Sequence, residues 1–177
     1  KIINCLIEKY GDKISVPNIR VWYDLLVFDY VFSKWLPVNI KTTTTKTSDN
    51  TGNLAMCVYA YTDLDLNLKK SYQNGQMSKI LIDKLRRLEL NILDKKDYYF
   101  VVVNKEITND IIVNSVKGLT ELTPNINNLP FQVCWNKNRQ FVYKNINANI
   151  NLFIQALKKP KPSWKETFMS EVRELNL

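Results

Sequence analysis

The sequence predicts an α/β domain in which a central mixed β-sheet is flanked by helices. Segments rich in branched and aromatic residues, typical of strands, alternate in blocks with segments whose apolar residues recur at helical spacing. Their order along the chain is helix, strands, helices, strands, helices. The chain has 177 residues, 45% of them hydrophobic, which is enough for one domain with a substantial core. We therefore expect residues 1–177 to form a single domain.

The first elements are a helix and a hairpin. Residues 1–10 carry apolar side chains at helical spacing and are followed by Gly11, which predicts a short amphipathic helix. The aromatic and branched segment 19–28 predicts a strand, and 35–43 predicts the second strand of the hairpin. Pro37 indicates that this second strand lies at a sheet edge or that residue 37 lies at the entrance of the strand.

Helical signals follow the hairpin. Ser48 and Asp49 are candidate caps of a helix that continues through a run with few breakers. The polar segment 66–76 contains an Asn-Gly pair and predicts a loop with a turn. Residues 77–90 form the most regular helical pattern, with Ser78 as the expected N-cap and the apolar residues on one face.

The second half of the chain predicts three strands and two helices. Residues 97–105 are a nearly continuous apolar run, as expected of a central strand covered on both faces. Residues 110–116 are expected to pair with that strand through a short polar turn, and 129–135 predict a further strand. Helical patterns over 148–159 and 163–175 close the chain.

Composition excludes several kinds of chemistry. The chain has no histidine, which removes nucleophiles activated by histidine and zinc sites of the HExxH type. Four glycines cannot build a P-loop or a GxGxxG cradle. Three widely spaced cysteines without a CxxC pair favour a reducing, cytoplasmic location. No apolar run approaches the roughly 18 residues of a membrane span. Catalysis would have to use carboxylates, lysine, tyrosine or a metal.

The chain is strongly basic. Its formal net charge is +8 and its pI is near 9.3. This charge favours a polyanionic partner such as a nucleic acid and argues against partners of the same sign. An Asn- and Lys-rich composition can also follow from an AT-rich genome, so the charge alone does not identify the partner.

Three polar residues stand on the two strands of the predicted hairpin. Asp24 lies within the first strand, and Asn39 and Lys41 lie near the end of the second. Asn39 and Lys41 are two residues apart, so they project to the same side of their strand. In a hairpin Asp24 can converge with them. A carboxylate, an amide oxygen and an ammonium group would then surround one polar notch, which suits Mg²⁺ and a phosphodiester.

The spacing Asp24, fourteen residues, Asn39-Ile40-Lys41 resembles the catalytic signature of the PD-(D/E)xK nuclease superfamily, particularly its type II restriction endonucleases. The resemblance covers residues 1–60 and implies a restriction-endonuclease-like core, with a helix before and after the two strands. It implies Mg²⁺-dependent, site-specific cleavage of double-stranded DNA by a homodimer. Asp24 and Asn39 would bind the metal, Lys41 would assist the attacking water, and Glu8 of the preceding helix would be an auxiliary ligand.

Two positions depart from the family pattern. Tyr23 rather than proline precedes Asp24, which costs little because that proline is often missing. Asn39 stands where most members carry Asp or Glu. An amide oxygen can bind Mg²⁺, but without the charge the affinity should fall. An engineered, inactivating replacement is a second explanation of Asn39, and Asp29 is an alternative first acid.

The expected functional regions follow one another along the chain. A catalytic core over about residues 1–105 would be followed by a DNA-recognition region over about 104–145 and by C-terminal helices over 148–177. Amide side chains can bind adenine and basic side chains can bind guanine or phosphate. The candidate DNA contacts chosen on this basis are Lys46, Lys70, Lys117, Asn136, Lys137, Asn138 and Arg139.

Two hypotheses compete with the nuclease. The chain could be a non-catalytic nucleic-acid-binding domain on the same scaffold, with Asn39 marking a degenerate active site. It could also be a basic structural protein whose charge reflects genomic composition alone. Salt-dependent binding that is indifferent to Mg²⁺ would favour the first of these, and wide separation of Asp24 from Lys41 would favour the second.

Overall fold

The computed structural model describes residues 2–93, 95–125, 130–158 and 166–175. The elements in chain order are α1 (Ile2–Tyr10), the 3-10 helix η1 (Gly11–Lys13), β1 (Ile14–Ser15), β2 (Leu25–Asp29), β3 (Lys34–Thr43), β4 (Ser48–Asn50), α2 (Leu54–Tyr61), α3 (Asn74–Arg86), β5 (Tyr99–Asn104), β6 (Ile111–Ser115), β7 (Gln132–Cys134), the 3-10 helix η2 (Trp135–Lys137), α4 (Ile146–Lys158) and α5 (Glu166–Glu174). The main sheet has the order β1-β2-β3-β5-β6, and β4 and β7 form a small second sheet. The predicted α/β class with a central mixed sheet is confirmed.

Strand β3 is the centre of the main sheet. It pairs antiparallel with β2, from Leu25↔Val38 to Asp29↔Lys34, and parallel with β5, from Val38↔Tyr99 onwards. The hairpin predicted from the sequence is therefore confirmed. The parallel pair needs a crossover, which α2 and α3 supply. The strand β3 as a whole is not an edge strand, but at Pro37 it has a partner on one side only, Leu26 of β2. Pro37 lies one residue before the pairing with β5 begins, so its missing N–H breaks no bond of that ladder.

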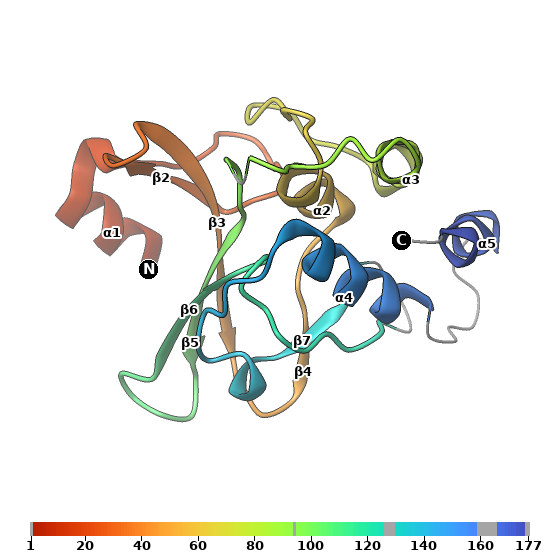
Figure 1. The fold of residues 1–177 in the computed structure, drawn as a ribbon. Coiled ribbons are helices and arrows are strands. Elements are labelled where there is room, and N and C mark those ends of the chain that lie inside the picture. Colours follow the sequence, from red (N-terminus) through yellow and green to blue (C-terminus); the bar gives the residue numbers. More distant parts are fainter. Residues whose placement is uncertain (1, 94, 126–129, 159–165, 176–177) are drawn as a thin grey trace.

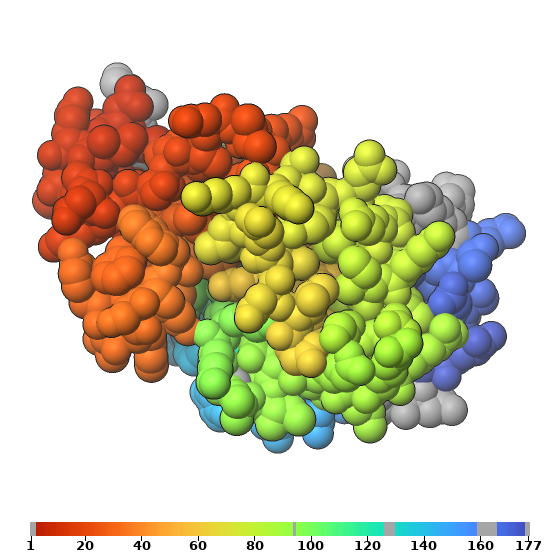
Figure 2. All heavy atoms as spheres, turned by 90° about the horizontal axis from the view of Figure 1, so that it is seen from above, coloured from red at the N-terminus to blue at the C-terminus, as the bar shows by residue number. Residues whose placement is uncertain are grey.

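The core lies on one side of the sheet. Figure 1 shows α2 and α4 on this side and α1 on the other. All eight residues of α2 are buried, and β5 alternates, with Phe100 and Val102 buried on the α2 side. From above, the α1 region (red) and the hairpin (orange) lie at one end of the molecule and α5 (blue) at the other (Figure 2). None of the described helices is long and apolar enough to cross a membrane.

The second face of the sheet is only partly covered, which corrects the prediction of a strand enclosed on both faces. Val101 of β5 is only partly buried, and Val113 of β6 is 59% exposed. The helix α1 is only nine residues long and reaches part of this face. A cavity of about 520 Å³ lined by Leu6, Val38, Val101 and Val113 remains beside it.

Three of the predicted elements differ in the structure, two of them because distant segments pair. Ser48 and Asp49 belong to β4, which pairs with β7, so they cap no helix. The strand predicted over 129–135 is shorter, Gln132–Cys134, and joins this small sheet rather than the main one. The helix over 77–90 begins earlier, at Asn74, so Ser78 lies inside α3 and the Asn-Gly pair is its first turn.

Asp97, just before β5, is a buried carboxylate that titrates near neutral pH. It is 9% exposed and accepts hydrogen bonds from the N–H groups of Tyr98 (2.7 Å) and Lys117 (3.4 Å). Burial raises the pKa of Asp97 from 3.8 to about 6, although Ser115 and the charge of Lys117 act in the opposite direction. The ionised carboxylate therefore destabilises the folded protein relative to the protonated one.

We predict that Asp97→Asn removes part of the pH dependence of unfolding. The raised pKa means that the folded state binds a proton more tightly than the unfolded state between about pH 4 and pH 6. The free energy of unfolding of the wild type should fall by roughly 2–3 kcal/mol across this window as pH rises, relative to the variant. Urea denaturation at a series of pH values measures the difference. A constant difference between the two proteins from pH 4 to pH 7 would contradict the prediction.

Candidate functional site

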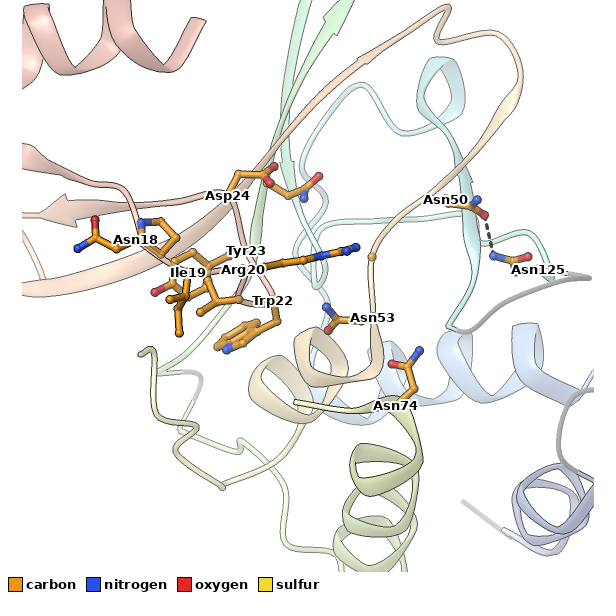
Figure 3. Close-up of a pocket in the computed structure, with 14 residues that line it drawn as sticks. Asn18, Ile19, Arg20, Trp22, Tyr23, Asp24, Asn50, Asn53, Asn74 and Asn125 are labelled. Carbon is orange, nitrogen blue, oxygen red and sulfur yellow. Dashed lines mark hydrogen bonds between the residues drawn. The ribbon is translucent and has the colours of Figure 1, made fainter. Parts of the chain in front are cut away.

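A cavity of about 750 Å³ opens beside β3 on the side of the sheet that carries α2 (Figure 3). Three parts of the chain form its wall: the irregular segment 17–24 that leads into β2, Asn39 of β3, and the loop 50–53 that leads into α2. The strand predicted over 19–28 begins only at Leu25, and this leaves residues 17–24 free to bend around the cavity. Asn74 and Asn125 complete the wall.

Asp24 lies where β2 begins and is bonded to β3 through both backbone and side chain. Its N–H donates to the carbonyl oxygen of Val38 (2.9 Å), and its carboxylate oxygen Oδ2 accepts from the N–H of Ile40 (2.7 Å). The second oxygen, Oδ1, has no hydrogen-bond partner among the described residues. The carboxylate is therefore held firmly by one oxygen and offers the other to the cavity that Asp24 lines.

Asn39 has a buried acceptor without a donor. Its Oδ1 atom makes no hydrogen bond within the described residues. Its side chain does hydrogen-bond the hydroxyl of Tyr98, and that hydroxyl donates to the carbonyl oxygen of Trp22 (2.9 Å). Because the tyrosine hydroxyl is committed as a donor, the amide N–H₂ of Asn39 must face it and Oδ1 must point elsewhere. An unpaired buried acceptor costs about 1–3 kcal/mol.

Asp24 and Asn39 are close to the same tyrosine hydroxyl. Burial raises the pKa of Tyr98, the negative charge of Asp24 raises it further, and the hydrogen bond from Asn39 lowers it. Four buried polar atoms lack partners among the described residues, and two of them belong to residues that line this cavity, Trp22 and Asn39. Unpaired buried groups are rare in folded proteins, so this concentration marks the cavity as a candidate binding site.

Lys41 lies on the same side of β3 as Asn39, two residues further on. Its ammonium nitrogen is 3.4 Å from Oδ2 of Asp49 in β4, and its side chain is 16% exposed. Lys41 does not line the cavity wall itself. The predicted notch is thus assembled from Asp24 and Asn39, with Lys41 on the same strand face and held by an acidic residue that the motif did not include.

The structure does not bring Glu8 into this notch. Glu8 is exposed on α1, and the α1 residues Leu6 and Tyr10 face the other side of the sheet, toward Val38. Asp29 is the last residue of β2, and its Oδ1 accepts from the N–H groups of Val31 (2.8 Å) and Phe32 (3.3 Å) in the hairpin turn. Among the described residues no three His, Cys, Asp or Glu side chains are grouped to hold a metal. A metal here would have one carboxylate and one amide ligand from the protein.

Three of the predicted DNA contacts gather in a second cavity of about 690 Å³ at the far end of β3 and β5. Lys46, Asn136 and Arg139 line it together. Arg139 pairs with Asp110 and donates to the amide oxygen of Asn136 (3.1 Å), and Lys46 lies 3.3 Å from Glu106. The guanidinium of Arg139 lowers the pKa of the Asp110 carboxyl. These groups are exposed and close to one another, as an interface with nucleic acid requires.

Two other predicted DNA contacts are buried. Asn138 is 1% exposed, and its amide accepts from the N–H of Thr120 (2.8 Å) and donates to the carbonyl of Cys134 (3.0 Å). Lys117 is 5% exposed and has partners within the protein. Both were expected on exposed loops. Asn138 is internal because an irregular loop needs side chains to satisfy its backbone groups, whereas Lys117 lies near the buried carboxylate of Asp97. We therefore exclude both from the candidate interface.

The remaining two predicted contacts are on the surface but outside either cavity. Lys137 pairs with Glu121 at 2.6 Å, which raises the pKa of the lysine. Lys70 is exposed in the loop before α3. Neither lines the two cavities.

Sequence patterns missed four residues around the first cavity. Arg20 was hidden inside the predicted first strand, and Asp49 was interpreted as a helix cap. Asn53 carried a usable signal, because it directly precedes an apolar run without breakers and is the N-cap of α2. Asn74 carried none, since its contact with the N–H of Leu54 joins two different helices.

Comparison of this chain with protein-family models, with curated proteins and with solved structures gives no match. The chemistry of the site must therefore be argued from its own geometry. Asp24 and Asn39 line one cavity, and Lys41 projects from the same side of β3 as Asn39.

We predict that Asn39→Leu leaves the free energy of unfolding unchanged or raises it by up to about 1 kcal/mol, because the variant removes an unpaired buried acceptor. Asn91→Leu is the matched control. Asn91 is also buried, but its amide donates to the carbonyls of Ala60 and Lys96 and accepts from the N–H of Lys95. The control should lose about 2 kcal/mol or more. Chemical denaturation measures both, and equal losses in the two variants would show that Oδ1 of Asn39 is paired internally.

Proposed function

We propose that this protein is a Mg²⁺-dependent endonuclease that cleaves double-stranded DNA at defined sites, with a core of the type II restriction enzyme kind. The observation that carries the proposal is the buried Oδ1 of Asn39, which lacks a donor and belongs to a residue that lines the same cavity as Asp24. Two such oxygens are suited to a hard cation rather than to an organic ligand.

The donor set fits Mg²⁺. This ion prefers oxygen ligands, takes one or two of them from the protein, and keeps positions for water and for phosphate oxygens. Asp24 and Asn39 would hold it. When bound, it supplies positive charge at the phosphate and lowers the pKa of a coordinated water. The neutral amide of Asn39 predicts weaker metal affinity than a second carboxylate would give, so substrate phosphate has a larger part in completing the site.

Lys41 and Asp49 contribute the remaining polar groups. The ammonium of Lys41 projects from the same side of β3 as Asn39 and can stabilise negative charge that develops on the phosphate. Asp49, 3.4 Å away, limits the positions that the long lysine side chain can occupy. Positioning of this kind lowers the entropy cost of reaching the transition state.

The arrangement of the elements also supports the proposal. The PD-(D/E)xK resemblance implies that the first acid and the lysine motif lie on adjacent strands framed by helices. Here Asp24 immediately precedes β2, Asn39 and Lys41 lie in the adjacent β3, α1 precedes the pair, and α2 follows it. Glu8 is left out of the proposed metal site because it lies on the opposite side of the sheet.

The charge distribution favours DNA as the substrate. The net charge is +8, and the second cavity presents Lys46, Asn136 and Arg139 at the end of the strand that carries Asn39. Basic groups of this kind contact phosphates, while Asn and Arg can also contact base edges. A homodimer is the expected assembly, because a symmetric enzyme suits a symmetric site on DNA.

A second candidate function is a non-catalytic nucleic-acid-binding domain with a degenerate active site. The observation that favours it is the neutral side chain at position 39 together with the ion pair that occupies Lys41. The two candidates differ in their response to Mg²⁺: the enzyme requires it for cleavage, whereas the binding domain is indifferent to it.

We predict that the wild type nicks or linearises plasmid DNA with Mg²⁺ and not with EDTA, and that Lys41→Ala lowers the rate at least about 100-fold, because it removes a group aimed at developing charge. Lys79→Ala is the control: this lysine is exposed on α3, away from both cavities, and has no ion pair among the described residues. Agarose-gel time courses on plasmids of varied sequence measure the rates. DNA binding without cleavage on every substrate would favour the second candidate.

Asn39→Asp is the complementary variant. It adds the charge that the metal site lacks, so Mg²⁺ should bind roughly tenfold more tightly in calorimetry, and cleavage should need less Mg²⁺. An unchanged metal affinity would place the metal elsewhere and remove Asn39 from the site.

A further inference from the structure

The geometry points to a phosphate-binding subsite in the first cavity, formed by Arg20, Asn53 and Asn74. It deepens the proposed nuclease function, on which the choice of substrate rests: the subsite takes a phosphate of the nucleic-acid strand next to the phosphate that is cleaved. The ligand that the subsite can take follows from which polar atoms of these three side chains already have hydrogen-bond partners within the protein.

Asn53 uses its oxygen for the protein and leaves its N–H₂ group free. Oδ1 accepts from the backbone N–H groups of Ala55 (3.0 Å) and Met56 (3.4 Å) at the start of α2. Backbone N–H groups only donate, so the atom that faces them must be the oxygen. The amide nitrogen is then on the other side, and it has no acceptor among the described residues. Figure 3 shows it directed toward Arg20.

Asn74, the first residue of α3, repeats this arrangement. Its Oδ1 accepts from the backbone N–H of Leu54 (3.1 Å), so its N–H₂ group is also turned away from α2. No acceptor for this nitrogen is present within the described residues. The two asparagines therefore satisfy the first N–H groups of α2 and present two new donors to the cavity.

Arg20 adds the charge. Its side chain is exposed, lines the cavity, and forms no hydrogen bond or ion pair with any described residue. In Figure 3 it is extended toward the side where Asn53 lies. A guanidinium group has five N–H donors and no acceptor, in a planar fork that matches phosphate oxygens.

The residues that line the cavity thus offer two chemically opposite sets of polar groups. Arg20, Asn53 and Asn74 offer donors, whereas Asp24 and Asn39 offer acceptors. A phosphate group suits the first set because its oxygens accept and do not donate, and a cation suits the second. The volume of about 750 Å³ exceeds that of one phosphate and leaves room for the adjoining nucleotide.

Asn53→Asp tests the subsite without removing the helix cap. Aspartate caps a helix as well as asparagine does, but it offers no N–H₂ group and repels phosphate. Asn145→Asp is the matched control, because Asn145 accepts from the N–H of Ala148 at the start of α4, outside the cavity. It makes the same change in charge. Arg20→Gln is a second variant that keeps length and polarity but removes the charge.

Binding of a short fluorescent DNA duplex, measured by polarisation in EDTA, is the readout. We expect Asn53→Asp and Arg20→Gln each to weaken binding about 10- to 100-fold, as loss of a charge-assisted hydrogen bond does, and Asn145→Asp to change it by less than about twofold. Thermal melting should show all three variants folded. Equal weakening by Asn53→Asp and Asn145→Asp, or no weakening by Asn53→Asp, would overturn the subsite.

Two further comparisons distinguish free phosphate from strand phosphate, and failure of the subsite from failure of the proposed nuclease. Broadening of the ³¹P signal of inorganic phosphate measures binding of the free ion. If Asn53→Asp broadens this signal as much as the wild type does but binds the duplex more weakly, the ligand is a strand phosphate. If it affects inorganic phosphate alone, the assignment to the strand is overturned. Binding of the duplex is measured in EDTA and so does not depend on cleavage. If the two variants bind the duplex more weakly but the wild type does not cleave DNA with Mg²⁺, the subsite stands and the nuclease is rejected. If the wild type cleaves DNA but the variants bind the duplex as well as it does, the nuclease stands and the subsite is rejected.

Discussion

The structure of the site depends on a mismatch in length between two paired strands. β3 has ten residues and β2 has five, so β3 continues past the point where β2 begins. On that side the backbone of β3 loses its partner strand after Val38, and the carboxylate of Asp24 takes over by accepting the N–H of Ile40 at 2.7 Å. A side chain thus replaces a strand. This replacement positions a carboxylate beside Asn39 and opens the cavity that both residues line.

The register of β3 against β5 explains why the oxygen of the half-buried Asn39 is shielded from solvent. The parallel pairing of β3 with β5 sets Asn39 opposite Phe100, a fully buried residue, so the amide is held at the margin of the core. A side chain in that position would be better paired or apolar if stability alone decided its identity. An unpaired oxygen beside a carboxylate is what the proposed metal site requires, because the metal would supply the missing interaction. The hydrogen bond between Asn39 and Tyr98 offsets part of the free-energy cost of the unpaired amide oxygen.

Local patterns predicted the parts of this architecture that depend on neighbouring residues. The hairpin, the apolar strand β5 and the helix α4 follow from periodicity and composition, and Asp24 and Asn39 follow from a motif within one hairpin. The boundary of α3 was misplaced locally, at Ser78, but the larger failures involve distant partners. Ser48 forms β4 only because Cys134 lies opposite it. Asn138 is polar and flanked by polar residues, yet it is buried because the N–H groups of Thr120 and Glu121 need its oxygen. No local pattern reveals such bonds.

Diffraction from crystals soaked in Mn²⁺ can show whether Asp24 and Asn39 together hold a metal ion. Manganese takes the same oxygen ligands as magnesium and scatters anomalously, so its position can be located independently of the protein atoms. We expect one anomalous peak within bonding distance of Oδ1 of both Asp24 and Asn39, absent from crystals of Asp24→Asn. Crystals that show no peak at this position, with the Asn39 oxygen accepting a hydrogen bond from the protein instead, would contradict the account.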